Sequence, residues 1–296
     1  MSGVSSIIMN ENNLNSIPAT FDASLNSAPY NKLYLPVNNA TNLSNCQIGL
    51  QKLHLYYSWP NINASNNTFT IQWKVAGAFQ NFTATIPANT NYSSVSDLNS
   101  WLQSYMISQG MYLVTTSTGN NVYYLEFVAN PNYYGVNLNL YLVPTALPGT
   151  CTQPSNFLGY PTVSCTPTIS FPATNNFYKL IGYAPTTVYN GGASAINYKS
   201  TFCPQLSPVS SILVSCNIAF NPLSLNGPST IISTFTSKGT TYGSLITNEP
   251  NEVIWYDINS SMTSLIQIDL LDQNYMPIPI QDPEICIQLL IRPKPN

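Results

Sequence analysis

The acidic side chains near the end of the sequence are the residues whose type and spacing could do chemistry. Four of the chain's eleven acids fall between residues 264 and 293, and three more lie shortly before them. A pair of Asp or Glu carboxylates is what a glycoside hydrolase uses, and clustered carboxylates can hold Ca²⁺. The seven residues are Glu249, Glu252, Asp257, Asp269, Asp272, Asp282 and Glu284.

Local sequence accounts for these carboxylates without catalysis. Asp269 falls on the polar side of an alternating strand, Asp272 opens an Asp-Gln-Asn turn, and Asp282 stands before a proline that leads into another strand. The two acids in the middle of the chain are Asp97, in the first turn of an expected helix where its charge suits the dipole, and Glu126, on a strand. We therefore predict neither a catalytic carboxylate pair nor a calcium site.

Other catalytic constellations are missing from the sequence. The single histidine, His54, lies inside a strand-like run and is expected to be a strand histidine satisfied by a neighbour rather than a triad base. One histidine cannot make a His-x-x-x-His metal motif, and the phosphate-loop, dinucleotide and nucleophile-elbow motifs do not occur. We predict that the protein is not an enzyme and has no catalytic, cofactor-binding or metal-binding residues.

Six cysteines are expected to be free thiols, because none forms a Cys-x-x-Cys pair that would hold zinc. Cys216 and Cys286 lie in apolar strand patterns and are predicted to be buried. Cys151 and Cys165 flank a proline-rich stretch, where a disulfide remains open. We expect neither a signal peptide nor a transmembrane helix, and therefore a protein that matures in a reducing compartment and is not secreted.

The composition limits the partners. Charged residues make up 6% of the 296 residues, with a net charge of −3 and eight basic residues scattered singly. Without a basic patch the chain is not expected to bind nucleic acid or to associate with anionic membranes. A surface of amides and hydroxyls with so little charge suits a protein that packs against neighbours, although an AT-rich genome would also enrich Asn, Ile and Tyr.

Apolar residues recur with a period of two along most of the chain, which predicts β-strands with one buried face. In the run 47–57 the apolar phase slips at Gln51 and Lys52, which predicts a β-bulge. The other alternating runs cover residues 69–75, 136–142, 212–218, 266–270 and 285–291. Short strands separated by Asn, Pro and Gly clusters favour an all-β sandwich, in which the last two strands are expected to pair across the turn at 272–277.

One segment, about 95–109, predicts an amphipathic helix instead. Its N-cap is Ser94 or Ser96, and Gly110 ends it. The apolar side chains recur at i, i+3, i+4, i+7 and i+8; they are Leu98, Trp101, Leu102, Tyr105 and Met106. Because the polar face carries Ser, Asn and Gln, the helix is expected to cover a sheet rather than a membrane.

The expected organisation has an extended N-terminal arm at 1–45 and a β-domain at 46–296. A long proline-rich insertion is expected at about 144–176, where prolines repeatedly deny ladder hydrogen bonds. A weak echo between the sequences that follow Asn45 and Ser215 leaves open an alternative of two domains, at about 40–143 and 177–296.

The closing segments resemble the last strands of jelly-roll capsid proteins of the adenovirus, polinton and virophage lineage. They are Trp-Tyr-Asp-Ile-Asn at 255–259, the run 265–280 and the run 285–292. The run 84–92, which leads into the expected helix, and the run 177–183 resemble further passages of these proteins. The resemblance covers about a quarter of the chain and is one of pattern.

This resemblance implies a jelly-roll β-sandwich in the virion capsid, made in the host cytoplasm or nucleus and associated with itself and with other capsid proteins. One jelly roll of this length fits a penton protein that forms pentamers at icosahedral vertices. A compact double jelly-roll major capsid protein, which forms trimers, is the alternative. A receptor- or glycan-binding β-sandwich is the second alternative, because the chain has twenty tyrosines and four tryptophans.

Overall fold

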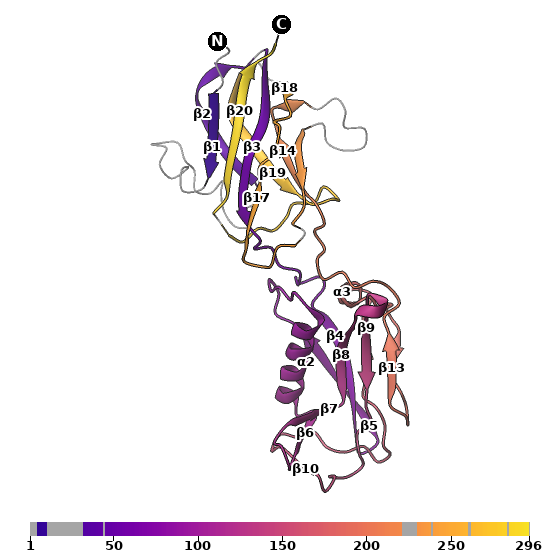
Figure 1. Cartoon of the computed structure of the whole chain (residues 1–296). Helices are drawn as coiled ribbons and strands as arrows, with labels where there is room; N and C mark the ends of the chain where they lie inside the picture. Colours follow the sequence, from indigo (N-terminus) through magenta and orange to yellow (C-terminus); the bar gives the residue numbers. More distant parts are fainter. Residues whose placement is uncertain are drawn as a thin grey trace. The chain divides into compact units, whose positions relative to one another are not determined.

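The computed structural model describes residues 5–10, 32–43, 45–220, 230–237, 239–259, 262–282 and 284–295. Strands dominate these residues, which confirms the all-β class (Figure 1). Contacts divide the chain into two compact units. Unit 1 combines Met1–Pro60 with Val209–Asn296, and unit 2 is Asn61–Pro208. Unit 2 is thus inserted, along the chain, between the two halves of unit 1.

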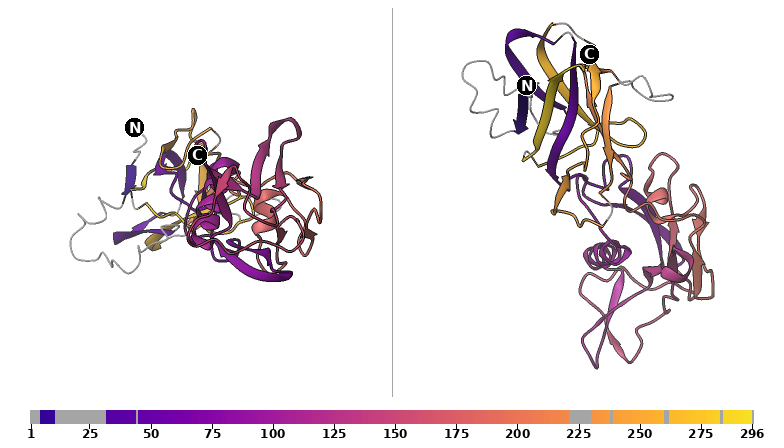
Figure 2. Two further views of the ribbon diagram at one scale, coloured as in Figure 1. Left: turned by 90° about the horizontal axis from the view of Figure 1, so that it is seen from below. Right: turned by 45° about the horizontal axis from the view of Figure 1, so that its top comes forward.

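Unit 1 is a jelly-roll-like sandwich of two antiparallel sheets, as predicted (Figures 1 and 2). The first sheet has the order β1 (Ser5–Asn10), β20 (Cys286–Pro293), β3 (Cys46–Tyr56), β18 (Tyr256–Ile258) and β15 (Ala219–Phe220), and β17 (Leu245–Asn248) also pairs with β3. The second has the order β16 (Ile231–Phe235), β14 (Ile212–Cys216), β19 (Met262–Leu271) and β2 (Lys32–Asn42). Alternate residues of both sheets, such as Leu53, Val214, Ile268 and Leu289, form one core.

The predicted bulge in β3 is confirmed. Lys52 lies opposite Gln288 of β20, whereas Leu50 lies opposite Leu289, so Gln51 has no partner in the ladder. The extra residue keeps Leu50 and Leu53 on the buried face although they are three positions apart.

The pairing expected between the last two strands is wrong. β19 pairs with β14 and β2, whereas β20 pairs with β1 and β3 in the other sheet. An isolated bridge between Leu271 and Pro277 closes the turn, and the chain then crosses to the opposite sheet. Each of the two strands has one apolar face. That face is buried equally well whether the strands pair side by side in one sheet or lie in opposite sheets and face each other across the core.

The N-terminal segment predicted as an arm at 1–45 contains two ladder strands. β1 pairs with β20 and β2 pairs with β19, so these residues belong to the two sheets. Backbone hydrogen bonds to a neighbouring strand need no particular side-chain pattern, which is why a polar sequence can fold this way. Residues 1–4, 11–31 and 44 of the predicted arm lie outside the described residues.

Unit 2 has three small antiparallel sheets and its own core. Their orders are β12 (Val188–Tyr189), β11 (Thr168–Ser170), β4 (Thr68–Val75) and β5 (Ala78–Thr85); β13 (Ile196–Lys199), β9 (Gly135–Leu140) and β8 (Leu125–Asn130); and β10 (Cys151–Thr152), β6 (Tyr112–Thr115) and β7 (Asn121–Tyr123). Aromatic rings fill the centre of the core. Phe69 stacks on Phe177 at a centroid distance of 4.8 Å and meets Phe127 edge-on at 6.1 Å.

The predicted helix is α2 (Val95–Gln109), which runs beside β4 and β8 in Figure 1. Ser94 is its N-cap and Gly110, at φ 71°, is its left-handed C-terminal residue. The described residues also contain a short helix that was not predicted, α3 (Phe177–Ile181), and a 3₁₀ turn, η2 (Pro131–Tyr133). Five residues are too few to show a helical period. None of the helices in the described ranges is long and apolar enough to span a bilayer.

The proline-rich segment predicted as an insertion lies inside unit 2, where it forms β10 and β11. Cys151 and Cys165 are unpaired thiols, so the disulfide left open by the sequence is not formed in this structure. The strands that open the weak echo, at Cys46 and Cys216, both lie in unit 1, whereas the run 69–73 of its first half is in β4 of unit 2. The Asn-Gly-Pro turn of the second half, at 226–228, lies outside the described residues.

Candidate functional site

Two of the candidate carboxylates act in turns, as predicted. The carboxylate of Asp272 accepts hydrogen bonds from the backbone N–H groups of Asn274, at 2.7 Å, and Met276, at 2.9 Å. The carboxylate of Asp282 accepts one from the N–H of Glu284 at 2.8 Å. Both are side chain to backbone turns in which the carboxylate replaces a backbone acceptor.

Asp257 belongs to a polar cluster on the first sheet of unit 1. Its carboxylate accepts hydrogen bonds from Lys294 Nζ at 2.6 Å and Gln47 Nε2 at 3.0 Å, and these lower the pKa of the carboxyl. Arg292 donates from Nε and Nη2 to Gln47 Oε1, at 3.0 and 2.9 Å, and its guanidinium lies 4.1 Å from the ring centroid of Trp255. Every charged side chain in this cluster is paired or stacked on a ring. We therefore interpret the cluster as one that stabilises the sheet.

Glu249 holds the single histidine. Its Oε1 lies 2.6 Å from Lys52 Nζ and 3.2 Å from His54 Nε2. The hydrogen bond from Lys52, followed by that from His54, lowers the pKa of the Glu249 carboxyl. The prediction of a strand histidine satisfied by a neighbour is therefore confirmed.

Three further acids, Asp97, Glu126 and Asp269, also have local roles. Asp97 caps α2 together with Ser94, and Glu126 accepts a hydrogen bond from the Tyr141 hydroxyl at 3.1 Å. Asp269 accepts two hydrogen bonds from Gln267 Nε2 on the same strand face. Among the residues that the structure describes, no group of three or more His, Cys, Asp or Glu side chains could hold a metal ion.

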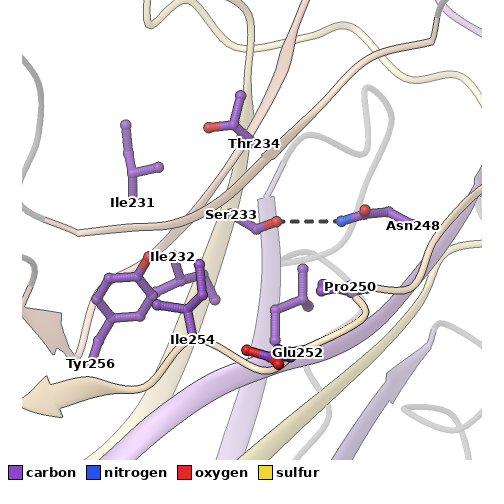
Figure 3. Close-up of a pocket in the computed structure, with 10 residues that line it drawn as sticks. Ile231, Ile232, Ser233, Thr234, Asn248, Pro250, Glu252, Ile254 and Tyr256 are labelled. Carbon is purple, nitrogen blue, oxygen red and sulfur yellow. Dashed lines mark hydrogen bonds between the residues drawn. The ribbon is translucent and has the colours of Figure 1, made fainter.

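One described acid, Glu252, lines a pocket. This pocket of about 500 Å³ lies in unit 1 between β16 and the segment that joins β17 to β18 (Figure 3). Leu50, Ile232 and Tyr256 contribute apolar surface, and Ser233 accepts a hydrogen bond from Asn248 Nδ2 at 3.3 Å. Ile254, which is 63% exposed, also lines it.

This pocket can seat an apolar group but has no equipment for acid–base chemistry. Its lining has one carboxylate and lacks histidine, cysteine and any cation. A general acid or base needs a partner group of matched pKa within hydrogen-bond reach of the substrate, and here Glu252 has none among the lining residues. Recognition of an apolar side chain is the chemistry that the pocket supports.

Sequence reasoning missed the exposed aromatic residues. The sequence placed most aromatics in the core, and Trp73 is indeed buried with its Nε1 bonded to the Gly159 carbonyl at 3.1 Å. Tyr133 and Tyr134, however, are 67% and 81% exposed at the end of η2. The Asn-Pro-Asn turn before them is the signal that could have found them, because side chains in a tight turn point outward.

Comparisons with known proteins find similarity in structure but not in sequence. No protein-family model matches the sequence, and no curated protein matches it significantly. The crystal structure of the mavirus penton protein is similar at a TM-score of 0.46 and 8% sequence identity, covering 98% of this chain and 99% of that chain.

Proposed function

We propose that the protein is a structural component of a viral capsid, a penton-like subunit that forms pentamers at icosahedral vertices. The observation that supports this proposal is the position, in the two sheets of unit 1, of the segments that resemble capsid proteins. The segments that resemble closing strands of capsid jelly rolls form β18, β19 and β20. β19 lies between β14 and β2, and β20 lies between β1 and β3, so the resemblance falls on internal strands of both sheets.

The surface of unit 1 supports a role in assembly. Large apolar side chains are exposed at Leu245 (47%), Ile254 (63%) and Met276 (60%). Charged residues make up only 6% of the chain, so contact with a neighbour would desolvate mainly apolar, amide and hydroxyl groups, which costs less than desolvating ions.

The organisation of the chain supports the penton over the major capsid protein. We propose that residues 61–208 are an insertion into a single jelly roll made by both ends of the chain. A double jelly roll would need a second two-sheet sandwich, whereas the described part of unit 2 has three sheets of three or four strands around an aromatic core and α2. On this proposal the protein resides in the virion, binds other capsid proteins and catalyses no reaction.

The mass of the purified full-length protein in solution tests this function. We expect a closed ring of five copies by light scattering, visible as rings in negative stain. Because the contacts would be apolar and amide-based, the mass should stay the same between 0.1 and 1 M NaCl, whereas rings held by ion pairs would dissociate. A monomer under all conditions contradicts the proposal, and a trimer supports the major capsid alternative.

A further inference from the structure

The outer face of one sheet in unit 2 carries an ordered set of polar side chains. In the sheet of β13, β9 and β8, Asn197 lies opposite Asn139, which lies opposite Glu126. In the next row Lys199 lies opposite Asn137. We call this face the amide platform; its members are Glu126, Asn137, Asn139, Tyr141, Asn197 and Lys199.

The opposite face of the same sheet explains why these side chains point outward. Phe127, Val136, Leu138 and Leu140 are buried in the core of unit 2. Side chains alternate along a strand, so burying these residues fixes the residues between them on the outer face. Figure 1 shows the three strands side by side.

Hydrogen bonds hold the amide platform in one arrangement. Asn197 Nδ2 donates to Asn139 Oδ1, Asn139 Nδ2 donates to the Tyr141 hydroxyl at 3.2 Å, and that hydroxyl donates to Glu126 Oε2 at 3.1 Å. Each amide has two donor hydrogens and an acceptor oxygen with two lone pairs, so these bonds leave further capacity on every Asn. The platform therefore offers fixed donors and acceptors side by side.

Aromatic rings border the platform where β8 turns into β9. Tyr133, Tyr134 and Phe202 are 67%, 81% and 62% exposed, and they line a hollow of about 160 Å³ that Asn137 and Lys199 also line. Lys199 Nζ lies 4.1 Å from the centroid of the Tyr133 ring, which orients that ring. We call the three rings the aromatic wall.

The backbone at the aromatic wall is strained. Tyr134 has a φ of +48°, a left-handed conformation that a residue with a bulky side chain adopts at a cost. Its side chain is 81% exposed, so burial of the ring does not offset that cost. Strained backbone positions are concentrated at functional sites, ligand-binding sites among them.

We propose that the amide platform and the aromatic wall bind a neutral oligosaccharide. Sugar hydroxyls both donate and accept hydrogen bonds, as amides do, and the C–H face of a sugar ring packs on an exposed aromatic ring. The platform carries one lysine and one glutamate, and residues 61–208 contain three lysines and two acids, so a ligand without charge is the complementary one. This inference does not rest on the capsid role.

The test uses full-length protein on an array of immobilised neutral hexose and N-acetylhexosamine oligosaccharides, with carboxylated sugars and heparin as separate arms. We expect saturable binding to neutral oligosaccharides that the same free sugar competes away. Tyr133→Ala and Asn139→Ala should each weaken it at least tenfold, because each removes a ring or a paired amide from the surface.

Phe79→Ala is the matched control. Phe79 is 53% exposed, lies on a different sheet of unit 2 and has Lys74 Nζ 5.3 Å from its ring centroid, so it reproduces the aromatic–lysine pair outside the proposed site. The Phe79→Ala variant should bind the neutral oligosaccharides as strongly as the unchanged protein does. Melting temperatures of all variants, measured alongside, separate loss of a contact from loss of the fold.

Several results would overturn the proposal. The first is that folded protein binds no sugar, and the second is that it binds only carboxylated sugars or heparin. The third is that Phe79→Ala weakens binding as much as Tyr133→Ala and Asn139→Ala do. If Tyr133→Ala instead lowers the oligomer mass while no sugar binds, the surface is an interface with a second copy. Because the oligomer mass of the unchanged protein is measured in the same samples, failure here is distinguishable from failure of the capsid proposal.

Discussion

Leu50 lies directly opposite Leu289 on the neighbouring strand, although Lys52, two positions further along β3, lies opposite Gln288, the residue next to Leu289. One residue of β3, Gln51, is therefore extra. Gln51 is exposed, whereas Leu50 and Leu53, on either side of the bulge, are both buried inside the sandwich. The bulge sets which side chains of this central strand are buried.

Deleting Gln51 should be tolerated, whereas deleting His54 from the regular part of β3 should destabilise unit 1 severely. Without Gln51, Leu50 and Leu53 stand two positions apart, so both stay buried and every pair with β20 is kept. Without His54, one half of β3 must shift by a position, which turns its apolar side chains away from the core. We expect a loss of about 3 kcal/mol or more in the free energy of unfolding for the His54 deletion, measured by urea titration, and about 1 kcal/mol or less for the Gln51 deletion. Equal losses in the two deletion variants would contradict the role of the bulge.

The capping box of α2 predicts a pH dependence of stability. Asp97 N donates to Ser94 Oγ at 3.1 Å, and Ser94 N and Ser93 Oγ donate to Asp97 Oδ2. These hydrogen bonds lower the pKa of the Asp97 carboxyl below 3.8, and the bond with Ser94 contributes most. The resulting stabilisation is complete above pH 3.8 and is lost as the pH falls through the lowered pKa.

The measurement is urea unfolding at several pH values from 7 to 2. Ser94→Ala should cost about 1 kcal/mol at pH 7. Asp97→Asn should lower the free energy of unfolding at pH 7. It should also make that free energy fall less steeply as the pH is lowered. Ser100→Ala, a mid-helix control whose hydroxyl donates to the Ser96 carbonyl, should be neutral or slightly stabilising. An unchanged acid slope in Asp97→Asn would refute the assignment.

Residues 61–208 should fold as an isolated domain. They have a separate core, and their two ends are tied together, because the buried Asn61 side chain donates from Nδ2 to the Leu206 carbonyl at 2.7 Å and to the Tyr92 carbonyl at 2.8 Å. We expect dispersed amide resonances and a cooperative thermal transition. Asn61→Ala should lower its stability by about 1–3 kcal/mol, because both carbonyls lose a partly buried donor. A collapsed fragment without a transition would show that unit 2 depends on unit 1.

The six thiols should differ sharply in reactivity. Cys216 is fully buried on β14, and burial raises the pKa of its thiol to about 11, whereas Cys203 is exposed. At pH 8 a thiol reagent should therefore modify Cys203 first and Cys216 only after unfolding. Cys203→Ser should remove the fastest phase of the reaction and Cys216→Ser should leave it intact. Persistence of the fastest phase in Cys203→Ser would contradict this order.

Much of the secondary structure could be predicted because its causes are local. The stripe of Leu98, Leu102 and Met106 with the Ser94 cap specifies α2, and the phase slip at Gln51 specifies the bulge. Alternation also located β4, β9, β14, β19 and β20. The turn roles of Asp272 and Asp282 followed from their neighbours in sequence. Each of these features depends on residues that are close together in the sequence.

The amide platform and the unit 1 pocket could not be predicted, because their members come from distant parts of the chain. Asn139 and Asn197 are separated by more than fifty residues and meet because β9 pairs with β13. Single Asn residues on polar strand faces carry no signal for such a meeting in a sequence so rich in Asn.

The sequence by itself determined the strand faces, the long helix, the bulge and the absence of a recognisable catalytic motif. Tertiary structure decided that β19 and β20 lie in opposite sheets, that both ends of the chain build one sandwich, and that 61–208 form a separate unit. The reason is that alternation records which face of a strand is buried but not which surface buries it. That choice is made by packing between residues far apart in the chain.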